Sequence, residues 1–283
     1  MSSAALELRP GVWGRLPVWL RAIVSGLSIG LIAANVWPVF LVKLGMPLGA
    51  LAEAVFLAVY VWWASGRGWP RATSATRRSA FRTGSLSRAQ WIWGLIAAFS
   101  IAASVHASLV VLFRIVPFPA VEFHRDYAFP VASLALKWVA IVVAAASAGI
   151  CEETGFRGYM QRPLEGRYGA VVAVLVSSFF FGLLHLSKSW DIGGMIPLVF
   201  FAGMLYGLLA WASNSLIPGM IGHTVMDIGM FSYWWTGVAG KFSARTIAET
   251  GIDGPFIVAC VVLGFVLLTA LSAIARLRVL RES

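Results

Sequence analysis

The chain has 283 residues, of which 59% are hydrophobic and only 12% are charged, and its mean hydropathy is +0.83. Soluble globular proteins carry about 25% charged residues, so this composition excludes an ordinary soluble domain and indicates a polytopic membrane protein. The net charge is +10, but the basic residues cluster between apolar runs. Membrane topology explains that pattern better than nucleic-acid binding does.

Eight apolar runs predict the fold: an all-α, polytopic membrane helix bundle of about eight transmembrane helices. A membrane-spanning helix needs about 20 predominantly apolar residues, and the first run is too long for the apolar part of a cleavable signal peptide. The predicted helices cover about 18–42, 48–64, 89–113, 131–157, 168–186, 195–212, 216–235 and 254–275.

Basic residues set the predicted orientation. The loop of about 65–88 holds six Arg and no acid, and the positive-inside rule places such a loop in the cytoplasm. The N-terminal tail, a short loop of 158–167 and the C-terminal tail are also basic. Eight helices would put all four segments on one side. We therefore expect an integral protein of the plasma (inner) membrane with both termini in the cytoplasm.

Several residues inside the apolar runs have a structural interpretation. Gly26–Gly30 and Gly203–Gly207 have the G-x-x-x-G spacing that lets membrane helices approach closely. Cys151 and Cys260 show no metal-binding or redox spacing, and we expect both to be small buried residues. Glu53 is expected near the outer end of its helix, in a structural ion pair or at the membrane interface.

The stretch Cys151–Arg157 carries the strongest signal for chemistry, because it places Glu152, Glu153 and Arg157 at the end of a long apolar run. Each ionisable residue inside a membrane helix costs about 2.5–3.5 kcal/mol on insertion scales. Glu153 and Arg157 are four residues apart and suit an ion pair on one helix face. Glu152 is rotated by about 100° from Glu153, so it can face elsewhere and act as a general base.

Two further positions place imidazoles in apolar runs. His185 lies near the end of the fifth predicted helix, where an interfacial or packing role is the ordinary interpretation of a lone His. His223 and Asp227 are four residues apart on the seventh helix and project from one face. His106 has no acidic neighbour in sequence and is interpreted as structural, and His124 lies in an outer loop.

These side chains could converge in one cavity, because burying them unpaired would be costly. A water held by Glu152 and His185 would be a hydrolytic nucleophile. His223 and Asp227 would then flank the developing oxyanion or bind a metal. Depth is a difficulty: His185 lies about 20 Å along its helix from the predicted inner end, whereas Glu152 lies close to the inner end of its own.

The order and spacing of three motifs resemble the CPBP family of intramembrane endopeptidases. This family includes the type II CAAX prenyl proteases and bacterial relatives that process bacteriocins or confer self-immunity. The resemblance covers about 131–236 and includes the stretch Asn214–Pro218. The matching motifs are Glu152-Glu153-x-x-x-Arg157, Phe181-x-x-x-His185 and His223-x-x-x-Asp227.

The resemblance implies an eight-helix bundle whose cavity opens toward the cytoplasmic side and the lipid, and cleavage of a peptide bond within or near the membrane. It implies that Glu152 activates water with His185 beside it. It also implies that His223 and Asp227 stabilise the oxyanion. Glu153 and Arg157 would be the supporting residues that hold the site together. In one integral membrane domain, the expected parts are N-terminal helices with the basic loop (1–130), a catalytic core (131–236), and the last helix with a basic tail (237–283).

Asp227 departs from the family pattern, because many members have Asn at this position. An Asn amide can donate a hydrogen bond to an oxyanion, whereas an ionised carboxylate cannot. Three alternatives stay open: Asp227 is protonated, it orients His223, or it helps to bind a cation. His185 and His223 with the carboxylate of Asp227 or Glu152 would make a zinc site with an open position. We favour water activated by glutamate without a cofactor, and zinc is the alternative.

Two other classes of function compete with a peptidase. A proton-coupled transporter also uses Glu and His inside a membrane, but the paired broken helices of many transporters are not found in this sequence. A non-catalytic immunity or scaffold protein on the same fold is the second alternative. The expected partners are the lipid bilayer and a membrane-associated protein or peptide substrate, with no nucleic acid, and nothing in the sequence indicates that the substrate is prenylated.

Overall fold

The computed structural model describes residues 12–118, 132–187, 195–235 and 245–282, and these ranges contain helices and no strand. The predicted all-α helix bundle is confirmed. The long helices lie within a few residues of the predicted runs, except that the last one continues to Glu282. They are α2 (Val18–Lys43), α3 (Leu48–Ala64), α5 (Arg88–Ile115), α7 (Leu134–Glu153), α9 (Ala170–Leu184), α10 (Met195–Ser213), α11 (Ile217–Trp235) and α13 (Gly254–Glu282).

Five helical segments in the described residues are long and apolar enough to cross a membrane: α2, α5, α10, α13 and the continuous stretch Leu134–Tyr168 that begins with α7. Helices α3 and α9 are apolar but shorter. The chain is therefore an integral membrane helix bundle, and the count of eight transmembrane helices stays a prediction.

Short helices occupy segments that the sequence suggested to be loops. The predicted loop of 158–167 is wrong, because the chain stays helical to Tyr168. Pro163 lies directly after the π-helical turn, at the beginning of α8, and Met160 and Leu164 are buried against α2 and α9. The short elements are α1 (Val12–Arg15), η1 (Arg71–Thr73), α4 (Ser74–Phe81), the π-helix η2 (Thr154–Gln161), α8 (Arg162–Tyr168), η3 (His185–Ser187) and α12 (Ile247–Thr250).

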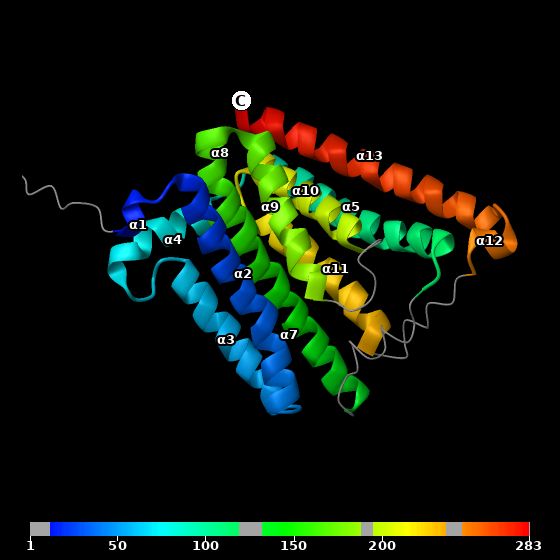
Figure 1. Cartoon of the computed structure of the whole chain (residues 1–283), viewed down its shortest axis with the longest axis horizontal. Coiled ribbons are helices and arrows are strands. Elements are labelled where there is room, and N and C mark those ends of the chain that lie inside the picture. The colour runs from blue at the N-terminus through cyan, green and yellow to red at the C-terminus, as the bar shows by residue number, and fades with distance from the viewer. Residues whose placement is uncertain (1–11, 119–131, 188–194, 236–244, 283) are drawn as a thin grey trace, which may run out of the picture.

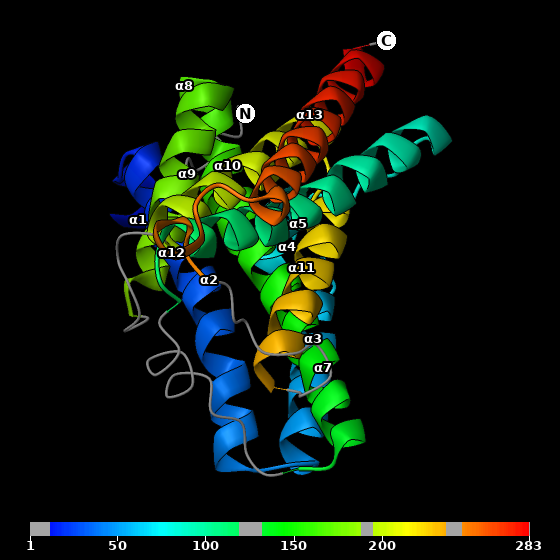
Figure 2. The same ribbon diagram turned by 90° about the vertical axis from the view of Figure 1, so that its right-hand side faces the viewer.

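The helices form two groups joined by the helices of the predicted core. Helices α2, α3 and α7 run side by side, and α13 packs along α5 (Figure 1). Figure 2 shows the α5–α13 pair directed away from the lower ends of α2, α3 and α7. Helix α11 packs against both α7 and α5, and α10 packs against α9 and α5, so these two helices connect the groups. His124 and most of the predicted outer loop around it lie outside the described residues.

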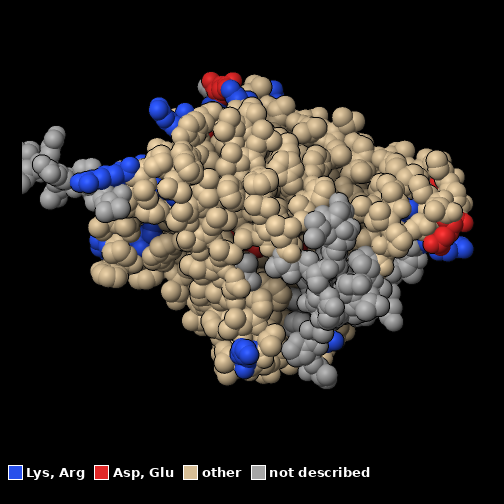
Figure 3. Space-filling model, in the orientation of Figure 1, with Lys and Arg blue, Asp and Glu red and all other residues tan. Residues whose placement is uncertain are grey.

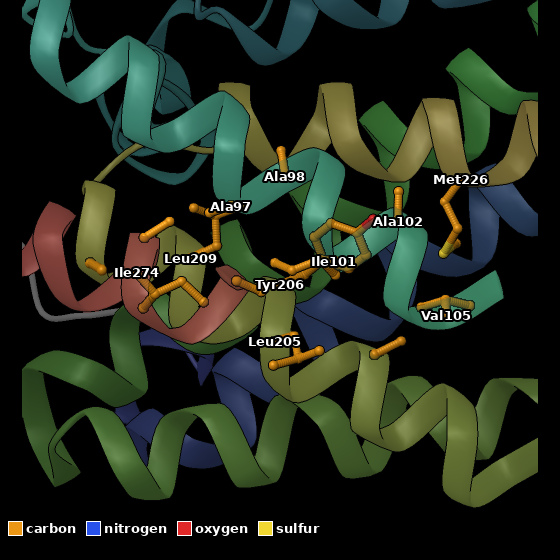
Figure 4. Packing of buried hydrophobic residues seen from close by; sticks show 14 of the residues in the cluster. Ala97, Ala98, Ile101, Ala102, Val105, Leu205, Tyr206, Leu209, Met226 and Ile274 are labelled. Carbon is orange, nitrogen blue, oxygen red and sulfur yellow. The ribbon is translucent and has the colours of Figure 1, made fainter. Parts of the chain in front are cut away.

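Small residues let the helices of the second group approach closely, as is usual where lipid replaces water around a bundle. Ala97, Ala98 and Ala102 on α5 are buried in a cluster with residues of α10, α11 and α13. Figure 4 shows Ile101 and Tyr206 lying together in this cluster. Tyr206 is 1% exposed, and it also reaches the candidate site described below.

The basic segments gather at one end of the molecule. Arg82, just after α4, forms an ion pair with Glu165 of α8 and donates to Asn214, which lies between α10 and α11. Arg281 near the end of α13 donates to the carbonyl of Trp211. Figure 3 shows basic side chains along the upper and left edges, with an acidic group beside those at the top, while uncharged residues form most of the rest of the visible face. The predicted cytoplasmic location of this end stays a prediction.

Candidate active site

Three segments carry the predicted site residues, and the fold brings them together in the interior. They are the junction of α7 with η2, the C-terminal end of α9, and the middle of α11. Helix α11 lies close to α7, since a Cβ atom added at Gly149 would lie 2.5 Å from Oγ1 of Thr224. Helix α9 is tied to η2 by a hydrogen bond of 3.0 Å from Ser177 Oγ to the carbonyl of Phe156.

The continuous helix from α7 through α8 resolves the difficulty of depth. Because this helix ends at Tyr168 and α9 begins at Ala170, both helices turn back at the same end of the molecule. Glu152 lies as far before Tyr168 as His185 lies after Ala170, to within one residue. The two side chains therefore start from similar depths, which the shorter predicted helix did not allow.

The π-helix η2 is held between neighbouring helices by both glycine pairs. A Cβ atom at Gly26 or Gly30 of α2 would lie 2.5 Å or 2.6 Å from side-chain atoms of η2, so the predicted close packing is confirmed for Gly26–Gly30. In Gly203–Gly207, the Gly203 carbonyl accepts from Arg157 Nη2 and the Gly207 carbonyl from Gln161 Nε2. π-Helical turns are frequent at functional sites, and this one follows the two adjacent glutamates directly.

The predicted Glu153–Arg157 ion pair is present and fully buried. Arg157 Nη1 lies 3.1 Å from Glu153 Oε1, and both side chains are 0% exposed. The guanidinium also donates to the Gly203 carbonyl at 3.1 Å and lies over the ring of Phe181, 4.5 Å from its centroid. A charge in such an interior is stable only when it is paired and hydrogen-bonded. Arg157 therefore fixes the carboxylate of Glu153 in place.

His223 lies at the centre of the cluster, with a carboxylate at each ring nitrogen. Nδ1 is 3.0 Å from Glu153 Oε1, the oxygen that also contacts Arg157. Nε2 is 3.7 Å from Glu152 Oε2 and 3.6 Å from Asp227 Oδ2. A carboxylate at Nδ1 fixes the orientation of an imidazole and leaves Nε2 to act. The buried ring thus presents one working nitrogen toward two acidic side chains.

The acidic side chains at Nε2 are the accessible edge of the cluster. Glu152 and Asp227 are 12% and 13% exposed, whereas Glu153 is 0% exposed. Their distances to Nε2 exceed those of direct hydrogen bonds. Glu152 and Asp227 are therefore the carboxylates of the cluster that can be reached from outside it.

His185 is anchored by the residue one helical turn before it. Its Nδ1 lies 3.0 Å from the carbonyl oxygen of Phe181. A carbonyl can only accept, so Nδ1 carries the hydrogen and Nε2 of the neutral ring is the acceptor. The Phe181 ring contacts both imidazoles, with centroid distances of 5.1 Å to His185 and 6.0 Å to His223. Phe181 thus joins His185 to the rest of the cluster.

Two supporting residues were missed or undervalued by sequence reasoning. Tyr206 of α10 stacks on His223 with a centroid distance of 5.3 Å and an angle of 13° between the rings. Its position between Gly203 and Gly207 gave no signal, because an aromatic residue in an apolar run is ordinarily packing. Phe181 marked a motif in the sequence, but its contacts with Arg157 and both histidines appear only in the fold.

Zinc is the alternative to a site in which glutamate activates water without a cofactor. In the parts of the chain that the structure describes, no group of three or more His, Cys, Asp and Glu side chains is arranged to hold a metal ion. Zinc stays untested, and metal analysis of the purified protein is the measurement that decides.

Other polar residues of the apolar runs make no contact with His223 among the interactions described above. Glu53 is not at an interface: its side chain is 0% exposed, and neither of its oxygens has a hydrogen-bond partner. Helix α7 covers it, because α3 packs against α7. His106 packs against Gly229 of α11. Cys151 is buried as expected, but the expectation for Cys260 is wrong, since it lies on the exposed face of α13.

Comparison with known proteins supports the resemblance of the motifs. Residues 133–229 match the family model of Rce1-like proteins, described as type II CAAX prenyl endopeptidase Rce1-like. The matched range contains α7, η2, α8, α9 and α10 and most of α11, and so includes every candidate site residue. No curated protein and no solved structure matches the chain. The family match supports a membrane-embedded peptidase of the CAAX type in general.

Proposed function

We propose that the chain is an intramembrane endopeptidase that hydrolyses a peptide bond of a membrane-associated protein or peptide. The observation that carries this proposal is His223, whose Nδ1 is fixed by Glu153 and whose Nε2 faces Glu152 and Asp227 at 3.7 Å and 3.6 Å. The match of residues 133–229 to the endopeptidase family supports the same reaction. The substrate need not be prenylated.

In the proposed reaction, Glu152 is the general base. It takes a proton from a water molecule, and the resulting hydroxide attacks the carbonyl carbon of the scissile bond. His185 accepts a hydrogen bond from the same water at Nε2 and helps to orient it. The proton on Glu152 then passes to the leaving amine as the carbon–nitrogen bond breaks. The base therefore returns to its carboxylate form, and one water is consumed.

His223 stabilises the oxyanion of the tetrahedral intermediate. In the doubly protonated imidazole both nitrogens donate: Nδ1 to Glu153, and Nε2 to the oxyanion. A donor fixed in advance costs no reorganisation during the reaction and typically contributes about 10²–10³-fold to the rate. Of the three roles open to Asp227, we propose that it orients His223: before substrate binds, its carboxylate lies 3.6 Å from Nε2 and holds the imidazolium in the active orientation by electrostatic attraction.

Membrane proteomics tests the activity in cells and identifies the substrate at the same time. Cells carrying the wild type are compared with cells carrying Glu152→Gln, a substitution of similar size that removes the base. We expect one or more membrane proteins to remain uncleaved in the Glu152→Gln cells, and the purified variant to lose about 10²–10⁴-fold in turnover of that substrate. The matched control is Glu282→Gln, because Glu282 is 59% exposed at the end of α13.

His185→Ala is the second arm of this test, with Leu186→Ala as its control, since Leu186 is the exposed neighbour. We expect His185→Ala to lose turnover while its thermal unfolding midpoint stays close to that of the wild type. Unchanged turnover in either Glu152→Gln or His185→Ala would show that the assigned roles are wrong. Stoichiometric zinc, together with activity that a chelator removes, would replace the cofactor-free mechanism.

A further inference from the structure

A second polar site lies at the basic end of the molecule, outside the cluster around His223. It is a partly open cavity of about 800 Å³ between α1, α2, α4, η2 and α8. This volume is within the usual range for small-ligand sites, about 300–1,000 Å³. The cavity begins at the N-terminal end of α2, where the first long apolar helix meets the basic segments.

Three guanidinium groups line the cavity, and none of its lining residues is acidic. Arg21 has no hydrogen-bond or ion-pair partner among the described residues, and its Nε is buried. Arg77 is 2% exposed and donates only to backbone carbonyls, among them that of Gly68 at 2.7 Å. Arg162 donates to the neutral amide oxygen of Asn214 at 3.1 Å. None of the three charges is neutralised by a carboxylate of the described residues.

Neutral donors complete the lining. The hydroxyl of Tyr159 is buried and has no hydrogen-bond partner, although such groups in folded proteins almost always have one. Ser and Thr hydroxyls from α2 and α4 also line the cavity, and Trp13 and Trp63 contribute their indole rings. Guanidinium and hydroxyl donors around a cavity suit a phosphate group, because its oxygens accept several charge-assisted hydrogen bonds.

We propose that this cavity binds the phosphate headgroup of an anionic phospholipid. Its place at the end of α2 and its Trp residues fit the level of lipid headgroups, where Trp is enriched. Basic pockets between membrane helices are known to accept such headgroups. A soluble phosphate ester has the same chemistry, and the experiment below separates the two sources. The proposal is independent of the peptidase activity.

The test measures binding to the full-length protein in a neutral detergent. Short-chain phosphatidylglycerol, phosphatidylcholine with the same acyl chains, and glycerol 3-phosphate are each titrated, and affinity is taken from native mass spectrometry and from the shift in unfolding temperature. We expect the wild type to bind phosphatidylglycerol at least about tenfold more tightly than either of the other two probes.

Two variants assign that binding to the cavity. Arg21→Gln removes a charge that has no hydrogen-bond or ion-pair partner among the described residues, so no polar contact of the fold is lost with it. We expect it to weaken phosphatidylglycerol binding by about tenfold, the usual effect of one charge-assisted hydrogen bond. Tyr159→Phe removes only the unpartnered hydroxyl, and we expect a smaller loss of about threefold. The control is Arg88→Gln, because Arg88 is exposed and does not line the cavity.

The outcomes are distinguishable. Loss of affinity in Arg21→Gln and Tyr159→Phe, with wild-type affinity in Arg88→Gln, supports the site. Equal affinities of Arg21→Gln and Arg88→Gln would overturn it, and so would equal binding of phosphatidylglycerol and phosphatidylcholine. If glycerol 3-phosphate bound as tightly as phosphatidylglycerol and lost affinity in Arg21→Gln, the lipid would be replaced by a soluble phosphate ester at the same site.

Discussion

The π-helix η2 stands between two polar regions with opposite electrostatic character. On one side Arg157 joins a cluster in which the charged groups contact one another, with Glu153 between Arg157 and His223. Two residues further along, Tyr159 lines a cavity whose three arginines have no acidic partner in the described chain. The contrast is the basis of the two proposals made above. A cluster with internal partners is pre-organised for chemistry, whereas unpaired cations are suited to an anion from outside.

The largest expected effect comes from breaking the internally paired cluster. Arg157→Met would remove the guanidinium from the carboxylate of Glu153, which is 0% exposed and would keep only its contact with His223 Nδ1 among the ion pairs described above. Removing one partner of a buried pair costs about 3–5 kcal/mol, a large part of the roughly 5–15 kcal/mol that stabilises a typical domain. We expect a much lower thermal unfolding midpoint and a poor yield of folded protein in detergent.

The control for Arg157→Met is Arg278→Met, whose ion pair with Glu282 lies at the surface with 42% and 59% exposure. Exposed pairs contribute about 0–1 kcal/mol, so this variant should unfold close to the wild-type temperature. Similar unfolding temperatures for the two variants would contradict the view that the buried pair holds the site together.

Two substitutions of Asp227 test its proposed role in orienting His223. If Asp227 only holds the ring of His223, Asp227→Asn should keep turnover within about tenfold of the wild type, because the amide oxygen still presents its negative end toward Nε2. Asp227→Ala removes the acceptor and should lose about 10²-fold, the usual contribution of one oxyanion donor when its orientation is lost. The measurement is the cleavage rate of the substrate that proteomics identifies. Equal rates for the two variants would mean that Asp227 does not act through its oxygen atoms.

The smallest effect is expected for the partly exposed ion pair between Arg114, at the C-terminal end of α5, and Asp253. Arg114 donates to Asp253 at 2.8 Å, and this bond, with the backbone N–H of Phe256, lowers the pKa of Asp253. A lowered pKa in the folded state stabilises the fold above the unfolded pKa of about 3.9, and the contribution is lost as the pH falls through the lower folded value.

Asp253→Asn isolates this charge, because Asn can still accept from the Phe256 N–H as an N-cap. We expect a slightly lower unfolding temperature than the wild type at neutral pH, and a difference that begins to close as the pH falls below the unfolded pKa of about 3.9. The readout is the unfolding midpoint measured from acidic to neutral pH. A difference independent of pH would show that the ion pair is not its cause.

The sequence predicted the helices well because each apolar run is long and bounded by Pro, Gly or basic residues. Helix α3 begins and ends at the residues expected for it, and α2 and α11 differ by a single residue at their ends. The loop of 158–167 was wrong because polar residues usually end a membrane helix. Here the helix continues, since Met160 and Leu164 are buried and Gln161 is hydrogen-bonded to α10.

The candidate site was only partly predictable. The Glu153–Arg157 pair follows from spacing on one helix, and the motifs indicated that His185 and His223 act with Glu152. Which carboxylate contacts which nitrogen of His223 could not be read from the sequence, because that depends on how α11 rotates against α7. Glu53 shows the same limit: its position in an apolar run suggested an ion pair or an interface, but the packing of α3 against α7 buries it without a hydrogen-bond partner.

By itself the sequence determined that this is an all-α membrane protein, which polar side chains lie inside its helices, and which family its central motifs resemble. Hydropathy and spacing are local properties, so they are readable along one chain. The tertiary structure alone decided that Glu153, rather than Asp227, holds Nδ1 of His223, that Tyr206 stacks on the ring, and that three arginines meet without an acid. These are contacts between helices, and they depend on depth and rotation that no single helix encodes.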